Sequence, residues 1–243
     1  MNDPCVKVFS STETMAGYFA DLLINAVNSD TSGGFVSLVL SGGSTPRAVY
    51  RYLATLPEGK VDWNRVRLFW GDERCVSPGS KESNYRMVRD ALLKRIDIPE
   101  SNIYRIRGEE EPFQEASRYS VLVSRKVLNE NNLPSFDIVM LGLGEDGHTL
   151  SIFPQSKKLF SSERLFEATV NPYSGQQRIT GTGKLVAGAK IAVFLATGGS
   201  KAEIAAQIIR QGGNLQKYPA SLVNPVNGRV IWLLDREAAR KLP

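Results

Sequence analysis

The chain is poor in the side chains that most often bind metals or crosslink proteins, with two cysteines and one histidine among 243 residues. Cys5 and Cys75 lie far apart, so they form neither a metal-type pair nor a disulfide framework, and free thiols in a reducing compartment are expected. No apolar run reaches the roughly 20 residues of a membrane helix, and the N-terminus has no signal-peptide pattern. These absences predict a cytoplasmic protein with no cysteine-pair metal site and no membrane partner.

The chain also lacks any concentrated block of positive charge, although its formal net charge is +5 and its pI is about 9.2. Basic residues are interspersed with acidic ones, as in residues 107–111, and form no arm or stripe. We therefore expect an anionic metabolite as ligand and no nucleic acid. A hydrophobic content of 42% and a charged content of 23% are typical of a soluble globular protein.

Apolar segments typical of strands alternate with segments of helical periodicity along the chain. Strands are predicted at 5–9, 35–40, 66–70, 102–106, 136–141, 191–196, 220–223 and 230–234. A capping box at Ser10 and Glu13 predicts the start of the first helix. Further helices are predicted to begin near residues 46, 84, 112, 182, 201 and 235. The helix that begins near 201 is predicted to end at Gly212 and Gly213. A polar loop at 156–164 precedes two alternating strands at 166–170 and 177–180.

This alternation predicts an α/β fold with a doubly wound, mainly parallel sheet and helices on both faces. A small antiparallel excursion is expected within 155–180. No internal repeat or low-complexity linker interrupts the pattern, so residues 1–243 are expected to form a single domain.

The stretch 136–154, FDIVMLGLGEDGHTLSIFP, carries the strongest functional signal. Its first residues form an apolar run that suits a strand buried on both faces, and a glycine-rich turn with Asp146 and His148 follows. Ligands of open α/β sheets bind just beyond the carboxyl ends of the strands. His148 is the only histidine, and histidine is the side chain that ordinarily changes charge near neutral pH. The pattern indicates a catalytic His148 with Asp146 beside it, the alternative being a surface histidine in a plain turn.

A second glycine motif, SGGSTP at 41–46, follows another predicted strand and opens a helix. The backbone N–H groups of Gly42, Gly43 and Ser44, together with the helix dipole, would suit a phosphate group. The motif lacks the lysine of a P-loop and the third glycine of a dinucleotide fingerprint. An ordinary serine-capped turn remains the alternative.

Two more strand ends carry charged side chains. Asp72 and Arg74 directly follow the strand at 66–70, a position more typical of a site than of a solvated turn. Lys201 lies in the first turn of a helix after TGGS, where a cation opposes the helix dipole. Its position indicates that Lys201 binds an anion. The alternative is a solvated lysine.

Taken together, the motifs resemble those of a known family. They are SGGSTP (41–46), FWGDER (69–74) with SNY (83–85), GLGEDGHTLSIFP (142–154), RIT (178–180) with TGGSKA (197–202), and the tail PASLVNP…GRVIWLLD (219–235). In this order, over nearly the whole chain, they resemble the 6-phosphogluconolactonases related to glucosamine-6-phosphate isomerase/deaminase. The resemblance implies hydrolysis of 6-phosphoglucono-1,5-lactone to 6-phosphogluconate in the oxidative pentose phosphate pathway. It implies no organic cofactor and no obligatory metal, and we expect a monomer or a weak homodimer.

The resemblance also implies residue roles. His148 is expected to be the general base that activates water, oriented or tuned by Asp146. The glycine loop at Gly42, Gly43 and Ser44 is expected to hold the substrate phosphate, with positive charge from Lys201 and Arg178. Arg74, with Asp72 beside it, is expected near the lactone or its phosphate. Leu150 and Gly181 depart from the family pattern, which has alanine and an apolar residue there, and we interpret both as local packing changes.

Lactone hydrolysis with His148 as the base has three alternatives. A deaminase of the same superfamily typically has a second acid shortly after the histidine, whereas 149–152 contains no carboxylate. A non-catalytic sugar-phosphate-binding protein would usually lack His148 or Asp146, and both are present. A covalent route through Ser151 lacks the G-x-S-x-G elbow. Lactone hydrolysis by His148 is therefore the prediction.

Overall fold

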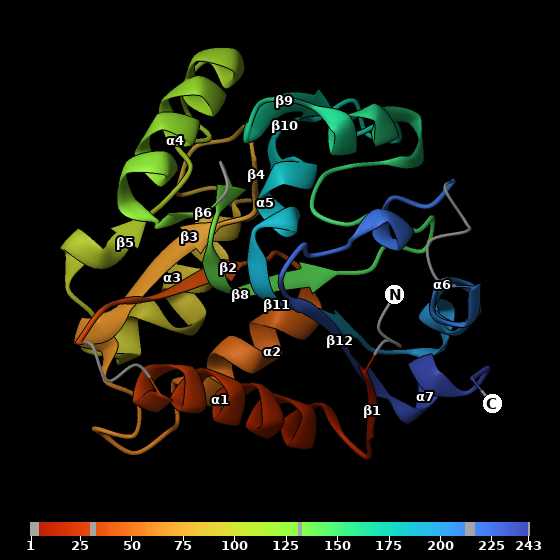
Figure 1. The fold of residues 1–243 in the computed structure, drawn as a ribbon, viewed down its shortest axis with the longest axis horizontal. Coiled ribbons are helices and arrows are strands. Elements are labelled where there is room, and N and C mark those ends of the chain that lie inside the picture. The colour runs from red at the N-terminus through yellow and green to blue at the C-terminus, as the bar shows by residue number, and fades with distance from the viewer. Residues whose placement is uncertain (1–4, 30–32, 131–132, 212–216, 243) are drawn as a thin grey trace.

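A central sheet and a smaller sheet organise the fold of the computed structural model, which describes residues 5–29, 33–130, 133–211 and 217–242 (Figure 1). Within these residues, seven strands pair in parallel in the order β1-β12-β11-β8-β2-β3-β5. Their bounds are β1 Cys5–Phe9, β2 Val36–Leu40, β3 Val66–Trp70, β5 Ile103–Tyr104, β8 Phe136–Gly142, β11 Ala189–Ala196 and β12 Arg229–Asp235. β2 is buried along its whole length, as an apolar run in a doubly covered sheet requires.

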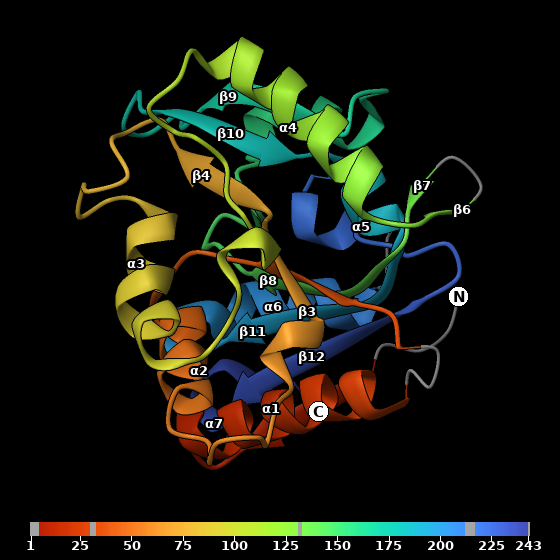
Figure 2. The ribbon, with the colours of Figure 1, turned by 90° about the vertical axis from the view of Figure 1, so that its left-hand side faces the viewer.

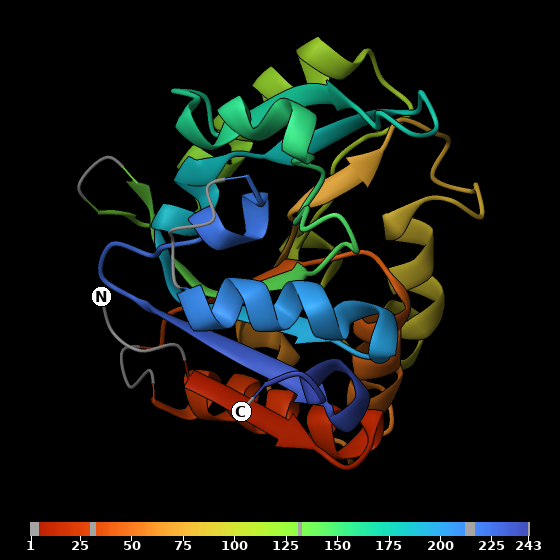
Figure 3. The same ribbon diagram turned by 90° about the vertical axis from the view of Figure 1, so that its right-hand side faces the viewer.

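Helices cover both faces of this sheet. Figure 3 shows α1 and α6 on opposite sides of β12. The helices are α1 Thr12–Ser29, α2 Ser44–Leu53, α3 Asn84–Ala91, α4 Pro112–Lys126, α5 Gly183–Ala187, α6 Ala202–Gln211 and α7 Arg236–Ala239. The predicted doubly wound α/β class is confirmed, and no described helix is both long and apolar enough to cross a membrane.

The strand order reverses between β2 and β8, which pair directly at Leu38 with Ile138 and Val39 with Val139. Along the chain, β2, β3 and β5 step toward one edge of the sheet, while β8, β11 and β12 step toward the other. Loops from the carboxyl ends of two such strands diverge and leave a crevice between them, where ligands of doubly wound folds bind. The turns after β2 and β8, which carry two of the predicted motifs, therefore meet at this point.

The smaller sheet is the predicted antiparallel excursion. In the described residues it has the order β4-β10-β9, with bounds β4 Asp72–Arg74, β10 Gln177–Gly181 and β9 Phe166–Val170. Only Gly71 separates β3 from β4, and the Gly181 N–H donates to the Gly71 carbonyl at 2.7 Å. One continuous stretch thus leaves the large sheet and becomes an edge of the small one. Figure 2 shows the small sheet above the large one, with α4 across its outer side.

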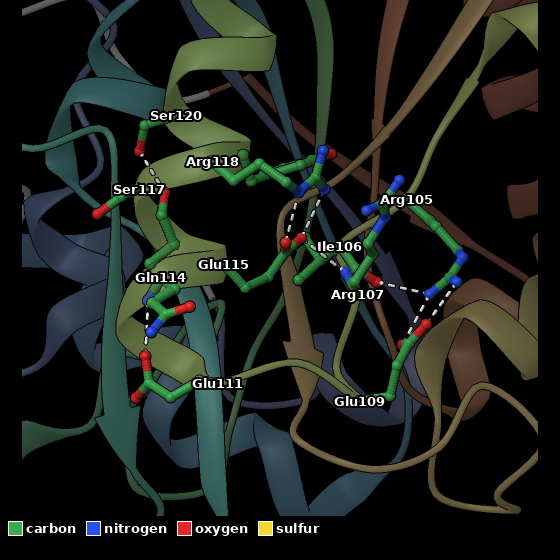
Figure 4. A network of polar contacts seen from close by, with 12 residues as sticks. Arg105, Ile106, Arg107, Glu109, Glu111, Gln114, Glu115, Ser117, Arg118 and Ser120 are labelled. Atoms are coloured by element: carbon green, nitrogen blue, oxygen red, sulfur yellow. Dashed lines mark hydrogen bonds and ion pairs between the residues drawn. The ribbon is translucent and has the colours of Figure 1, made fainter.

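A buried carboxylate anchors α4 to the preceding loop (Figure 4). Glu115 is 1% exposed and accepts hydrogen bonds from the Arg107 N–H and the Arg118 guanidinium, each at 2.7 Å. Such pairing is what allows a charge to be buried. Glu111 caps the helix by accepting from the Gln114 N–H at 2.8 Å, as the acidic run before Pro112 predicts.

Several predicted boundaries were wrong for local reasons. The first helix is capped by Ser11, which accepts from the Thr14 N–H at 3.2 Å while its own N–H donates to the Thr14 hydroxyl; this reciprocal pair replaces the predicted Ser10–Glu13 box. The polar segment 156–164, predicted as a loop, overlaps a 3₁₀ helix, Pro154–Ser161. The segment 220–223 overlaps a 3₁₀ helix, Pro219–Leu222, instead of forming a strand, because its Ala220 N–H bonds to the Gly147 carbonyl and a proline fits the first turn.

The remaining short elements connect these layers. They are the 3₁₀ helices Trp63–Arg65, Leu93–Arg95, Glu100–Asn102 and Gly199–Lys201, and the paired strands β6 Asn129–Glu130 and β7 Leu133–Pro134. The predicted strand at 102–106 is reduced to the two residues of β5. The predicted helix end at Gly212 and Gly213 lies outside the described residues.

Candidate active site

The turn after β8 folds His148 back against its own start. The Gly144 N–H donates to the His148 carbonyl at 2.8 Å, and Gly147 has a φ of +79°. A Cβ at Gly144 would lie 2.0 Å from His148 Nδ1, so a side chain there would displace the imidazole. Glycine is therefore required at 144 for close approach and is favoured at 147 for its backbone conformation.

His148 and Asp146 form a directed pair. Asp146 Oδ1 lies 2.6 Å from His148 Nδ1 and also accepts from the His148 N–H at 3.1 Å. Asp146 Oδ2 accepts from the Tyr173 hydroxyl at 2.7 Å. Because Nδ1 donates to a carboxylate, a neutral His148 carries its proton there and leaves a lone pair on Nε2. The side chain is 32% exposed, so solvent and ligand can reach it.

Asp146 is held in its charged form. Burial by itself would raise the pKa of this carboxyl, but the Tyr173 hydroxyl and His148 together outweigh burial and lower it below its ordinary value. A carboxylate that stays ionised stabilises an imidazolium beside it. The pair can therefore accept and return a proton through Nε2.

The glycine turn after β2 presents the start of α2 at the same edge of the sheet. Gly43 precedes the helix with a φ of +110°, and no side chain caps the helix. The first N–H groups of a helix have no partner within it. Thr45 shares a 2.7 Å hydroxyl contact with Thr197, which fixes this turn against the one after β11.

The turn after β11 brings Lys201 beside the β8 turn. Lys201 Nζ lies 3.7 Å from Glu145 Oε1, and the lysine side chain is mostly covered while Glu145 is exposed. A hydrogen bond from Ser200, followed by Lys201, lowers the pKa of Glu145. Lys201 thus lies in the same loop cluster as His148, with one exposed and weakly held counter-charge.

Arg74 and Arg178 lie on the small sheet, where β4 and β10 pair them directly. Their Nε atoms are buried without a hydrogen-bond partner, while Arg74 Nη1 donates to the Glu82 carbonyl. Burial, and then the charge of Arg74, lower the pKa of Arg178. Two partly covered guanidinium groups with unsatisfied Nε donors have the chemistry to bind an anion.

Asp72 differs from the other predicted residues because its carboxylate is already engaged. It is buried, accepts from the Ser151 hydroxyl at 2.6 Å, and lies 3.4 Å from Asn84 Nδ2, which also donates to the Asp72 carbonyl. A Cβ at Gly42 would lie 2.2 Å from Asn84 Oδ1. Asp72 therefore links β4, α3 and the segment after His148, and Gly42 is required for close packing.

Three features of the site have no counterpart in the sequence analysis. Tyr173 bonds Asp146 from the turn between β9 and β10, and nothing in NPYSG signals that contact. The Thr45–Thr197 contact joins residues 152 positions apart. Glu73 is buried and accepts from the N–H groups of Asn84 and Tyr85 at 2.7 Å, capping α3 from outside the helix. The charge cluster at 71–74 was the available signal for Glu73.

The two departures from the family pattern lie in one contact region. Leu150 is buried with a φ of +55°, and a Cβ at Gly71 would lie 2.8 Å from its Cδ2. Gly181 bonds to the Gly71 carbonyl, and a Cβ there would lie 2.6 Å from Leu185 Cδ1. Both positions thus pack around Gly71, at the junction of the two sheets.

Comparison with known proteins places the chain in a family. A family model described as glucosamine-6-phosphate isomerases/6-phosphogluconolactonase matches residues 10–232. The chain belongs to this family. A relative in Aggregatibacter actinomycetemcomitans, named 6-phosphogluconolactonase, is 42% identical over 204 residues, covering 84% of this chain and 86% of its own.

Two solved structures have the same fold as this chain. The crystal structure of the devB protein matches with a TM-score of 0.93 at 36% identity and covers 98% of this chain and 99% of its own. The 6-phosphogluconolactonase of Leishmania guyanensis matches with a TM-score of 0.88 at 27% identity and covers 99% of both chains. The mainly parallel sheet with a small antiparallel one is thus the family's architecture.

Proposed function

We propose that this protein is a 6-phosphogluconolactonase, hydrolysing 6-phosphoglucono-1,5-lactone to 6-phosphogluconate in the oxidative pentose phosphate pathway, with His148 as the general base. The observation that carries the proposal is the 2.6 Å Asp146–His148 pair at the strand-order reversal, in a chain of the lactonase family. His148 Nε2 is directed away from Asp146 and remains accessible.

The reaction needs one proton to be moved twice. Nε2 removes a proton from water as its oxygen bonds to the lactone carbonyl carbon, giving a tetrahedral oxyanion and an imidazolium. The oxyanion then re-forms the carbonyl as the bond to the ring oxygen breaks, and that oxygen takes the proton from Nε2. Asp146 stabilises the imidazolium between these steps. Arg74 or nearby backbone N–H groups would stabilise the oxyanion, one such donor being worth about 3 kcal/mol.

The cations and the glycine turn would hold the phosphate. The N–H groups at Gly42, Gly43 and Ser44, with Lys201 and Arg178, offer donors and positive charge around the crevice. Holding the far end of the substrate orients its ring toward His148, which lowers the entropic part of the barrier. Asp72 contributes by fixing Asn84 and Ser151.

We also propose a cytoplasmic location, a single domain over residues 1–243, a monomer or weak homodimer, and no requirement for a cofactor or a metal. Gel filtration with light scattering checks the oligomeric state. Activity in the presence of EDTA checks the metal requirement.

A coupled assay tests the proposed function. Glucose-6-phosphate dehydrogenase generates the lactone in situ, and 6-phosphogluconate is followed with and without this protein, spontaneous hydrolysis being subtracted. We expect clear acceleration. Ammonia release from glucosamine 6-phosphate would instead favour the deaminase alternative, and binding of a lactone analogue without turnover would favour a non-catalytic sugar-phosphate-binding protein.

A further inference from the structure

Tyr173 combines an exposed ring with a specifically bonded hydroxyl. Tyr173 is 66% exposed as a whole, yet its hydroxyl donates to Asp146 Oδ2 at 2.7 Å. The other oxygen of Asp146 is occupied by His148. Both carboxylate oxygens are therefore engaged, one by each neighbour, and the carboxylate plane is fixed.

The turn that carries Tyr173 is itself ordered by local hydrogen bonds. Asn171 Oδ1 accepts from the Tyr173 N–H at 2.9 Å, and the Asn171 carbonyl accepts from the Gly175 N–H at 2.9 Å. Gly175 has a φ of +69°, which closes the turn. Gln176 Nε2 contacts Glu82 Oε1 at 3.2 Å on the far flank. The turn thus delivers Tyr173 to Asp146 from a defined position.

An aromatic contact supports the same placement. The Phe153 ring lies 4.7 Å from the His148 ring and 6.1 Å, edge-on, from the Tyr173 ring. These separations fall within the range of favourable aromatic pairs. Tyr173 therefore approaches the histidine by two routes, through the carboxylate and through Phe153.

We propose that Tyr173 is a positioning residue that locks the Asp146 carboxylate and thereby keeps the proton of neutral His148 on Nδ1, with Nε2 free to act. The proposal rests on the proposed function, in which His148 is the base, and it extends that function by assigning the base role to Nε2. In this arrangement a carboxylate orients a histidine, as in a catalytic triad. The carboxylate is in turn oriented by a hydroxyl from the small sheet.

The physical reason is rotational freedom. A carboxylate held at one oxygen can turn about its terminal torsion, which is broad and poorly defined by itself. Without the Tyr173 hydroxyl, Oδ2 would be free to exchange places with Oδ1 or turn toward water, and the Nδ1 contact would be intermittent. The other titratable neighbours of the 143–148 turn are Glu145 with Lys201, and Tyr218 against Gly147; none of them bonds Asp146.

The single histidine makes this testable without activity. The ¹⁵N signals of His148 report which ring nitrogen carries the proton and how the ring titrates, free of overlap. Wild-type protein is expected to show the Nδ1-protonated form at alkaline pH. In Tyr173→Phe we expect a measurable fraction of the Nε2-protonated form.

Tyr218→Phe is the matched control. It removes a hydroxyl that bonds Gln207 at 2.9 Å, and its ring also lies against the β8 turn, at Gly147. The ¹⁵N spectrum and kinetics of this variant are expected to stay as in the wild type. Tyr173→Ala separates ring from hydroxyl, because the phenylalanine variant keeps the contact with Phe153.

Kinetics provide a second readout. Tyr173→Phe is expected to lower kcat about tenfold, the effect of one hydrogen bond to a charged group, with KM changed by less than about twofold because Tyr173 is not part of the phosphate site. A wild-type tautomer and a wild-type kcat in Tyr173→Phe would overturn the proposal, as would a defect only in Tyr173→Ala. A shifted tautomer in a protein without lactonase activity would support the positioning role while overturning the proposed function.

Discussion

Arg74 and Arg178 occupy directly opposite positions on antiparallel strands β4 and β10. Like charges at such positions destabilise a sheet, and here neither Nε has a partner. We expect this arrangement to cost stability in the free protein and to become favourable when an anion binds. The pair is therefore a predicted binding place, among the described residues, for a ligand with negative charge.

Replacing Arg178 by Gln should separate binding from stability. We expect KM for the phosphorylated lactone to rise at least about tenfold, as for a lost charge-assisted hydrogen bond. The free energy of unfolding without phosphate should stay the same or rise by up to about 1 kcal/mol, because the repulsion is relieved. Arg164→Gln, which removes an exposed arginine 3.6 Å from Glu167, is the control. Chemical denaturation and steady-state kinetics measure both quantities, and an unchanged KM would place the phosphate elsewhere.

His148 can be tested by removal. His148→Asn and His148→Ala should lower kcat by about 10² or more, the typical contribution of a general base, with a smaller change in KM. The coupled assay provides the measurement, with spontaneous hydrolysis subtracted. Near-normal turnover of either purified variant would remove His148 from the base role.

Ser151 should affect stability more than turnover. Its side chain is fully buried and donates to Asp72 Oδ2 at 2.6 Å. Ser151→Ala leaves a buried carboxylate short of one donor, and we expect a loss of about 1.5–3 kcal/mol in the free energy of unfolding. kcat should remain within about tenfold of the wild type. A fall to the uncatalysed rate in a folded variant would instead indicate a nucleophilic serine.

On the acid side, the pH dependence of kcat/KM should reflect the protonation of a single group. The folded-state pKa of Asp146 is lowered by Tyr173 and His148 in spite of burial. Its contribution to stability is therefore present above its unfolded value of about 3.9 and is lost as the pH falls through the lower folded value. Asp146 thus stays charged where histidine ordinarily titrates, between about pH 5 and 8. We expect log(kcat/KM) to fall with a slope of about 1 per pH unit as the pH is lowered, because only one essential group then takes up a proton. A slope near 2 would contradict the assignment of a single base.

The sequence was sufficient to predict the features that depend on hydrophobic periodicity and on the residues that follow each strand. The apolar runs of β2, β8 and β11 predict a parallel sheet, and the glycine turns that follow them predict where ligands bind. His148 and Asp146 were found because they are two residues apart in one turn, so that no long-range information was needed. The family resemblance linked the remaining motifs in order.

Contacts between distant segments could not be predicted in this way. Tyr173 reaches Asp146 over 27 positions, and Arg178 meets Arg74 only because β4 crosses into the small sheet. Asp72 was predicted beside Arg74, but its burial under Ser151 depends on tertiary packing. The boundary errors at Ser10 and at 220–223 arose where two registers or two short conformations satisfy the same local pattern. The roles of the site residues in binding and catalysis stay predictions.

Gly71 joins β3 to β4 without an intervening loop, so the predicted anion site on the small sheet is connected directly to a strand of the large sheet. We expect an anion bound between β4 and β10 to stiffen their pairing, and because β4 continues into β3, occupancy should slow amide hydrogen exchange across 166–181 and into β3. A substrate bound in this way would rigidify the hairpin over the crevice, and that hairpin is the one that carries Tyr173.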